Sequence, residues 1–157
     1  MKIDEQSPRQ DGHDAVPRPF SVSIEQAPLE GAGNVQSGNL TWRTLISGDR
    51  TPSDQITLGV ADFPPHGTLN VHRHEPAEFY FGLAGEGTVF ADGLSLRIAP
   101  GIAVFIPGST DHGVVAGNQG LSIVYGFAQR TFDGVIYDFK DGAQPRSLTS
   151  AGAPARK

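Results

Sequence analysis

Two histidines, a glutamate and a tyrosine recur at even spacing in residues 72–80, whose sequence is HRHEPAEFY. Side chains on a β-strand alternate between its two faces, so His72 and His74 are expected to point the same way. After a short break the alternation resumes, and Glu78 and Tyr80 share one face. A polar set of this kind is costly to bury unless a ligand binds to it. This stretch is therefore the first candidate site.

A third histidine, His112, follows His72 by forty residues and comes just after the Pro-Gly turn in GIAVFIPGSTDH. A sheet that curls back on itself would bring His112 opposite the first pair. Three imidazole nitrogens and the Glu78 carboxylate would then form one donor set. Such a set suits Fe(II), Mn(II), Ni(II), Co(II) or Zn(II), because imidazole binds these metals well and the carboxylate balances charge. The chain has no cysteine, which excludes disulfides and thiolate ligands.

The elements that must position these residues are predicted to be short strands. Apolar runs alternate with turn sequences such as AGEG (84–87), ADG, PG and AGNQG (116–120), and no segment keeps a helical apolar period for long. This spacing predicts an all-β domain, either a sandwich, a jelly roll or a barrel. The predicted strands are FSVSI, LTWRTLIS, QITLGVADF, LNVHRH, EFYFGL, GTVFA, LSLRIA, IAVFIP, GVVA, LSIVYGFA and GVIYDF.

The length of 157 residues is enough for one domain with its own core. Both ends are polar and contain proline, so we expect flexible tails at 1–18 and 141–157 around a barrel domain at 19–140. The net charge of −5 argues against nucleic acid and anionic lipid as partners. The chain shows neither a signal-peptide pattern nor an apolar run of roughly 18 residues, so we expect a soluble cytoplasmic protein without a membrane partner.

Two motifs separated by fifteen residues resemble those of the cupin superfamily. The first has the order glycine, His-x-His, glutamate, glycine, and the second has glycine, proline, histidine. The matching residues are Gly67, His72, His74, Glu78, Gly85, Gly101, Pro107 and His112. The resemblance covers residues 20–140 approximately, and it implies a double-stranded β-helix, the jelly-roll barrel of cupins. It also implies one divalent transition metal (Fe, Mn, Ni, Co or Zn), with His72, His74, Glu78 and His112 as ligands.

The order His, His, Glu, Tyr, His is similar to that of small single-domain dimethylsulfoniopropionate lyases, in which the tyrosine after the glutamate acts as a base. This resemblance implies that Tyr80 is catalytic and that a small-molecule carboxylate substrate is cleaved by β-elimination. A packed core role is the alternative for Tyr80. The whole protein could instead be an Fe(II)-dependent dioxygenase or a non-catalytic sensor of a metal or small molecule. Family resemblance also predicts a homodimer, formed through early strands such as LTWRTLIS.

Several other residues are expected to have structural roles. Trp42 is expected to pack in the core, and Tyr125 either to pack there or to line the pocket. Arg43 is expected to form a surface or interface ion pair, although it could meet a substrate carboxylate. His66 is expected at the surface and Asp111 in a solvated turn. The segment DGVIYDF is expected to close an outer strand or a dimer contact.

Overall fold

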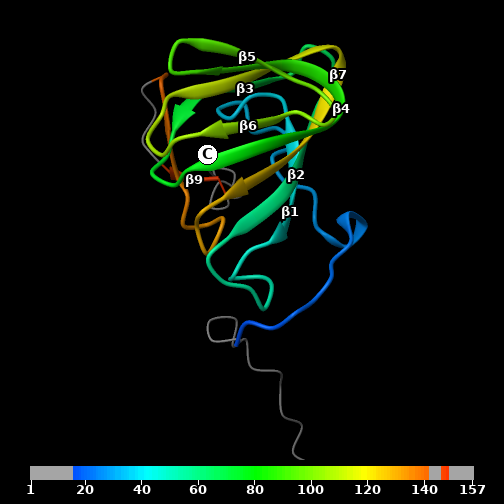
Figure 1. Cartoon of the computed structure of the whole chain (residues 1–157), viewed down its shortest axis with the longest axis vertical. Helices are drawn as coiled ribbons and strands as arrows, with labels where there is room; N and C mark the ends of the chain where they lie inside the picture. The colour runs from blue at the N-terminus through cyan, green and yellow to red at the C-terminus, as the bar shows by residue number, and fades with distance from the viewer. Residues whose placement is uncertain (1–15, 142–145, 149–157) are drawn as a thin grey trace, which may run out of the picture.

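The computed structural model describes residues 16–141 and 146–148, and in this part of the chain the regular elements are strands apart from one short 3₁₀-helix. The all-β class predicted from the sequence is therefore confirmed. The elements are η1 (Ile24–Gln26), β1 (Thr41–Ile46), β2 (Thr57–Phe63), β3 (Thr68–Arg73), β4 (Glu78–Ala91), β5 (Leu94–Ile98), β6 (Ala103–Ile106), β7 (His112–Phe127), β8 (Ile136–Phe139) and β9 (Arg146–Ser147) (Figure 1).

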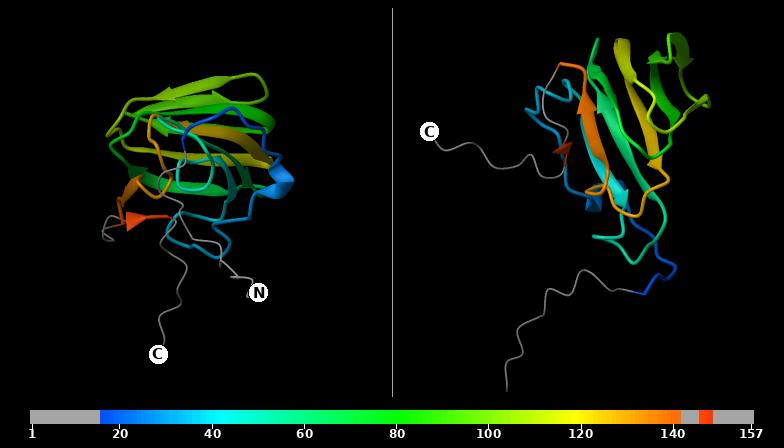
Figure 2. Two further views of the ribbon diagram at one scale, coloured as in Figure 1. Left: turned by 90° about the horizontal axis from the view of Figure 1, so that it is seen from below. Right: turned by 90° about the vertical axis from the view of Figure 1, so that its left-hand side faces the viewer.

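The two longest strands, β4 and β7, pair antiparallel along their whole length and bend together. The first part of β4 also pairs with β6, and the corresponding part of β7 pairs with β2, which pairs with β1. The second part of β4 pairs with β5, and its partner in β7 pairs with β3, which is followed by β8 and β9. The strands therefore form two layers that share β4 and β7 and wrap around one interior (Figure 2).

The bend lies where the register of the β4–β7 pair shifts, between Gly82 and Ala84 and again between Gly85 and Gly87. The sequence predicts turns at 84–87 and 116–120, and four strands where the structure has β4 and β7. The prediction of four separate strands is wrong, because the register shifts at these glycines lie inside two continuous strands. Bulges increase the local twist and bend, which lets one strand belong to both layers.

The strand predicted at FSVSI (20–24) is also wrong. Its residues are mostly exposed, so they have no apolar face to bury against a sheet. The Ser23 N–H binds the side chain of Gln26, and the Gln26 N–H binds the Ser23 carbonyl, which closes the 3₁₀ turn of η1. These residues therefore form local hydrogen bonds instead of pairing with a neighbouring β-strand.

The predicted alternation around the candidate site is confirmed. Glu78 and Tyr80 are buried at the start of β4, whereas Phe79 and Phe81 are exposed on its outer face. The interior between the layers is rich in aromatic side chains, including Trp42 from β1, and burying such a side chain contributes about 1.5–3 kcal/mol. Aromatic rings pack directly against His72 and His74, including those of Tyr137, Phe139 and Phe127.

The predicted tails lie mostly outside the described residues. Within the stretch predicted as the C-terminal tail, 141–157, β9 pairs with β8 and the side chain of Leu148 is buried. In the described part of the chain no helix has the length and hydropathy needed to cross a membrane.

The bend makes a testable prediction at Gly85, which has a φ of 66° and whose missing Cβ would lie 2.1 Å from the carbonyl oxygen of Gly120. Gly93 is a matched control, because its φ is 74° and nothing lies within 4 Å of its missing Cβ. We expect Gly93→Ala to lower the free energy of unfolding by about 1–2 kcal/mol, the usual cost of the left-handed conformation. Gly85→Ala should lower it clearly further, since backbone atoms must also move apart. Denaturant unfolding measures both, and equal losses would contradict the crowding at Gly85.

Candidate metal centre

His72, His74, Glu78 and His112 converge in the interior, as the spacing of the sequence predicts. His72 lies on β3 and His74 just beyond its end, Glu78 begins β4, and His112 begins β7. Their potential ligand atoms all lie within 4.8 Å of one another, and all four side chains are buried. His72 and His112 are direct partners across the β3–β7 ladder, with ring centroids 4.2 Å apart. These four residues could hold a metal ion.

Each histidine ring is oriented by the backbone. The Nδ1 atom of each ring lies within hydrogen-bond distance of a carbonyl oxygen two residues away in sequence. The distances are 2.8 Å from His72 to Asn70, 2.9 Å from His74 to Pro76 and 2.7 Å from His112 to Thr110. A carbonyl oxygen only accepts, so each Nδ1 donates a proton. The opposite nitrogen, Nε2, is then available for contacts with the other residues of the cluster. Metal-binding histidines are oriented in this way.

The Glu78 carboxylate is the centre of the hydrogen bonds between these side chains. Its Oε2 atom lies 3.1 Å from His74 Nε2 and 3.0 Å from His112 Nε2. Burial alone would raise the pKa of Glu78, but the hydrogen bonds from His112 and His74 lower it to about 2. Burial likewise would lower the pKa of His112, but the hydrogen bond to Glu78 raises it. The carboxylate is therefore held in its charged form.

His72 is the exception, because its Nε2 atom is buried and has no hydrogen-bond partner. Burial and the neighbouring His112 lower the pKa of His72 to about 3, so this imidazole is neutral. A neutral imidazole with Nδ1 protonated carries a free lone pair on Nε2. Such an atom beside a carboxylate and two further imidazoles could ligate a cation. The donor set thus fits a divalent transition metal.

Two tyrosines adjoin the cluster. The hydroxyl of Tyr80 donates to Glu78 Oε2 at 3.2 Å, and burial and the Glu78 charge raise the pKa of Tyr80 well above 10. Tyr137 on β8 stacks on His72, with ring centroids 4.9 Å apart, and burial also raises its pKa. The sequence analysis does not single out Tyr137. The alternation in GVIYDF could have identified it, because Tyr137 and Phe139 are buried whereas Ile136 is exposed.

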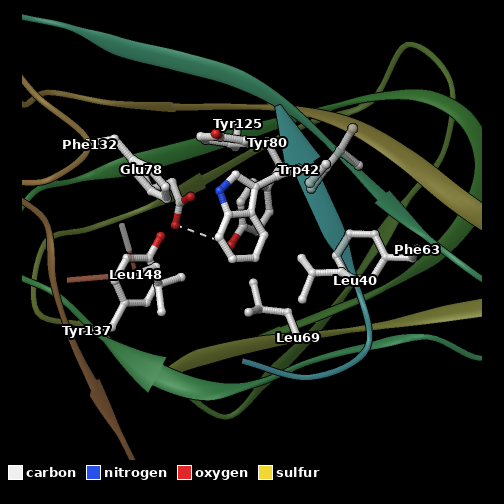
Figure 3. Close-up of a pocket in the computed structure, with 12 residues that line it drawn as sticks. Leu40, Trp42, Phe63, Leu69, Glu78, Tyr80, Tyr125, Phe132, Tyr137 and Leu148 are labelled. Atoms are coloured by element: carbon white, nitrogen blue, oxygen red, sulfur yellow. Dashed lines mark hydrogen bonds between the residues drawn. The ribbon is translucent and has the colours of Figure 1, made fainter. Parts of the chain in front are cut away.

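A narrow cavity of about 30 Å³ lies beside Glu78 and Tyr80 (Figure 3). Trp42, Tyr125 and Tyr137 line it together with aliphatic side chains, and no lysine or arginine of the described chain lines it. A cavity of this size holds about two water molecules. A larger ligand therefore requires some of these side chains to move.

Comparison with known proteins identifies the family. Residues 59–124 match a family model described as a cupin domain. The chain is also 42% identical over 125 residues to the dimethylsulfoniopropionate lyase DddW of Ruegeria pomeroyi, covering 80% of this chain and 82% of that protein. The chain is a cupin.

Solved structures agree with the cupin barrel. The polyketide cyclase RemF from Streptomyces resistomycificus is 24% identical with a TM-score of 0.60, over 70% of this chain and 79% of that one. A predicted oxalate decarboxylase from Thermotoga maritima is 22% identical with a TM-score of 0.62, over 70% and 99%. An RmlC-like cupin from Shewanella frigidimarina is 22% identical with a TM-score of 0.57, over 70% and 90%. At these identities the likeness shows the fold, which is the double-stranded β-helix predicted from the sequence.

We call His72, His74, Glu78 and His112 the metal-type cluster. The remaining residues named from the sequence lie outside it. Trp42 is buried as predicted, and Tyr125 both packs in the core and lines the cavity. Arg43 donates to the carbonyl of Ala27 instead of forming the predicted ion pair among the described residues. His66 is exposed, and Asp111 forms an ion pair with Lys140 at 2.8 Å.

Metal binding can be tested against a histidine outside the cluster. We expect the chelator-treated cupin to bind one equivalent of a divalent ion, and His72→Ala to weaken binding by more than the 10–100-fold typical of residues that only support a ligand. His66→Ala should bind as the wild type does, because His66 is exposed. Elemental analysis after dialysis gives the stoichiometry.

The same ion should stabilise the fold. At 100 times its Kd, a ligand that binds only the folded state adds about 2.7 kcal/mol, or about 5–11 °C in Tm for a chain of this size. Thermal unfolding should show this increase in the wild type and in His66→Ala and show little of it in His72→Ala. Full binding and stabilisation in His72→Ala would rule out the site.

Proposed function

We propose that this cupin is a metal-dependent lyase that cleaves dimethylsulfoniopropionate by β-elimination into acrylate and dimethyl sulfide. The observation that carries the proposal is the 42% identity to a dimethylsulfoniopropionate lyase over most of both chains. The buried contact between Tyr80 and Glu78 is consistent with it, because it provides a group for proton transfer beside a metal-type donor set.

In this proposal His72, His74, Glu78 and His112 hold one ion of Fe, Mn, Ni, Co or Zn. The donor set suits each of these metals, so it leaves the choice among them open. When bound, the ion would act as a Lewis acid on the substrate carboxylate and make the adjacent C–H group more acidic. The free Nε2 of His72 and the charged state of Glu78 prepare the donor set for such an ion.

Tyr80 is the base in the proposed reaction. Its phenolate takes the proton from the carbon next to the substrate carboxylate, and that electron pair forms the new C=C bond. The C–S bond breaks at the same time, and its electrons leave with dimethyl sulfide, which carries no charge. Because burial and the charge of Glu78 raise the pKa of Tyr80, the phenolate needs a neighbouring positive charge to be stable. A metal ion held by the neighbouring cluster would supply this positive charge.

The cavity suits the other end of the substrate. Aromatic rings from Trp42, Tyr125 and Tyr137 line it, and a sulfonium cation is attracted to such ring faces. The cavity must widen from its volume of about 30 Å³ to admit the substrate, since most ligand pockets have volumes of about 300–1,000 Å³. Side-chain rearrangements on binding are common.

We also propose that the protein is a cytoplasmic homodimer. The edge strand β1, within the predicted dimer segment LTWRTLIS, pairs only with β2 among the described strands. On its other side Trp42 forms an isolated bridge with Glu30, and the rest of this edge leaves main-chain groups available to a second copy.

The lyase proposal is tested by reconstituting the protein with each of the five ions and measuring dimethyl sulfide in the headspace and acrylate in solution. Release should require the metal. Tyr80→Phe should lower kcat by about 10²–10⁴, the usual contribution of a general base, while leaving metal binding intact.

Tyr125→Phe is the matched control for Tyr80→Phe. Both hydroxyls are buried near the cavity, but that of Tyr125 is hydrogen-bonded to Thr44 Oγ1 at 3.0 Å and not to Glu78. Its removal should lower kcat less than tenfold. Absence of dimethyl sulfide with every metal would refute the lyase, and oxygen uptake with small carboxylic acids would then favour the dioxygenase. Equal effects of the two variants would refute the role of Tyr80.

A further inference from the structure

Two buried side-chain polar atoms in the described part of the chain lack a hydrogen-bond partner: His72 Nε2 and Trp42 Nε1. The metal-type cluster accounts for the first. Trp42 is the only tryptophan of the protein, and just 4% of it is exposed. Buried N–H groups without a partner are rare in native proteins, and each requires an explanation. The Trp42 N–H is therefore a candidate contact for a ligand.

The indole group lies at the cavity beside the proposed reaction centre. Trp42 lines the same cavity as Glu78 and Tyr80. Figure 3 shows its indole nitrogen turned toward the side of the cavity where Glu78 lies. A ligand in this cavity would thus meet the indole N–H and the metal-type cluster together.

The indole ring is held firmly in this position. The backbone of Trp42 forms two hydrogen bonds with that of Glu30, at 2.8 and 3.1 Å. The ring packs directly over Gly31, where an added Cβ would lie 2.1 Å from the indole ring, and meets Phe132 edge to face at 6.1 Å. A donor fixed in this way loses little entropy when it binds an acceptor.

No hydrogen bond joins this donor to another group of the described cavity. An indole N–H can only donate. The hydrogen bonds from His74, His112 and the Tyr80 hydroxyl all go to Glu78 Oε2, and the Tyr125 hydroxyl is bonded to Thr44. The indole N–H is therefore available to an acceptor that a ligand brings into the cavity.

We infer that Trp42 Nε1–H donates a hydrogen bond to the substrate carboxylate and so determines specificity for small carboxylates. This inference rests on the proposed function, because the carboxylate oxygens are the only hydrogen-bond acceptors of dimethylsulfoniopropionate and its sulfonium group accepts none. No arginine or lysine lines the described cavity, so a carboxylate bound there would rely on the proposed ion and on neutral donors such as the Trp42 N–H. The bond therefore places the carboxylate end of the substrate on the side of the cluster and leaves the ring faces, including those of Tyr125 and Tyr137, for the cation.

The first experiment uses the wild-type protein, loaded with diamagnetic Zn(II) and labelled with ¹⁵N in the tryptophan indole. One tryptophan gives one indole N–H signal, which needs no assignment. The probes are 3-(methylthio)propionate, which has the carboxylate, and ethyldimethylsulfonium, which lacks it. We expect the first to move the indole proton downfield and the second to leave it in place. A bound carboxylate that leaves the signal unmoved would overturn the inference, as would failure of the carboxylate to bind at all.

The second experiment removes the donor. Trp42→Phe, and replacement of Trp42 by 3-benzothienylalanine, which keeps the ring shape without the N–H, should each weaken binding of 3-(methylthio)propionate by about 10- to 150-fold. Both should change the affinity for ethyldimethylsulfonium by less than about threefold, since cation–π contacts survive. The control is Phe63→Leu, which alters an apolar cavity wall and should affect both probes alike. Equal weakening of both probes by the Trp42 variants would mean a role in shape only and would overturn the inference.

The two proposals fail separately. Release of dimethyl sulfide with an unmoved indole signal would overturn the role of Trp42 and leave the lyase standing. A downfield shift with the carboxylate probe but no dimethyl sulfide would support the carboxylate contact and refute the lyase.

Discussion

The site depends on one bent ladder, the antiparallel pairing of β4 with β7. Glu78 pairs with Phe127 at one end of this ladder and His112 pairs with Ala91 at the other. If the strands were straight, these ends would lie roughly 40 Å apart. Glu78 Oε2 and His112 Nε2 are nevertheless 3.0 Å apart, because the ladder folds over on its bulges and its two ends face each other. The backbone of residues 82–87, where the register shifts, therefore helps to set the geometry of the metal-type cluster.

The folded ladder encloses a polar centre within an aromatic interior, and this contrast determines what the cavity can hold. Glu78 is the only charged side chain that lines the described cavity, and its neighbours are neutral or share its hydrogen bonds. A buried carboxylate needs such partners or a cation, since desolvation otherwise favours its neutral form. A metal ion would satisfy the charge, and ring faces and a single indole N–H would remain to recognise a substrate. Charge is thus located at Glu78, ring faces are offered by residues such as Tyr125 and Tyr137, and the unpaired N–H belongs to Trp42.

Strand parity and residue chemistry were enough to predict the four clustered residues, the inward direction of Tyr80 and the fold class. They could not distinguish a turn from a bulge, because either can place glycine at positive φ, and Gly85 and Gly120 have φ values of 66° and 78° inside continuous strands. The alternation in GVIYDF indicates that Tyr137 faces inward, but its place beside His72 depends on the β3–β8 pairing, which no local pattern encodes. The unpaired N–H of Trp42 likewise becomes visible only once its neighbours are placed in space.

The carbonyl oxygens that orient the three histidine rings belong to the main chain, at Asn70, Pro76 and Thr110. A point mutation at any of these positions changes the side chain but leaves the carbonyl group in place. The orientation of the rings is thus protected from most genetic change, in contrast to sites where a carboxylate or amide side chain orients the ligand. Substitutions at these three positions can therefore leave the contacts to the imidazoles in place. The same ring orientation could therefore be kept without conservation of the side chains at these three positions.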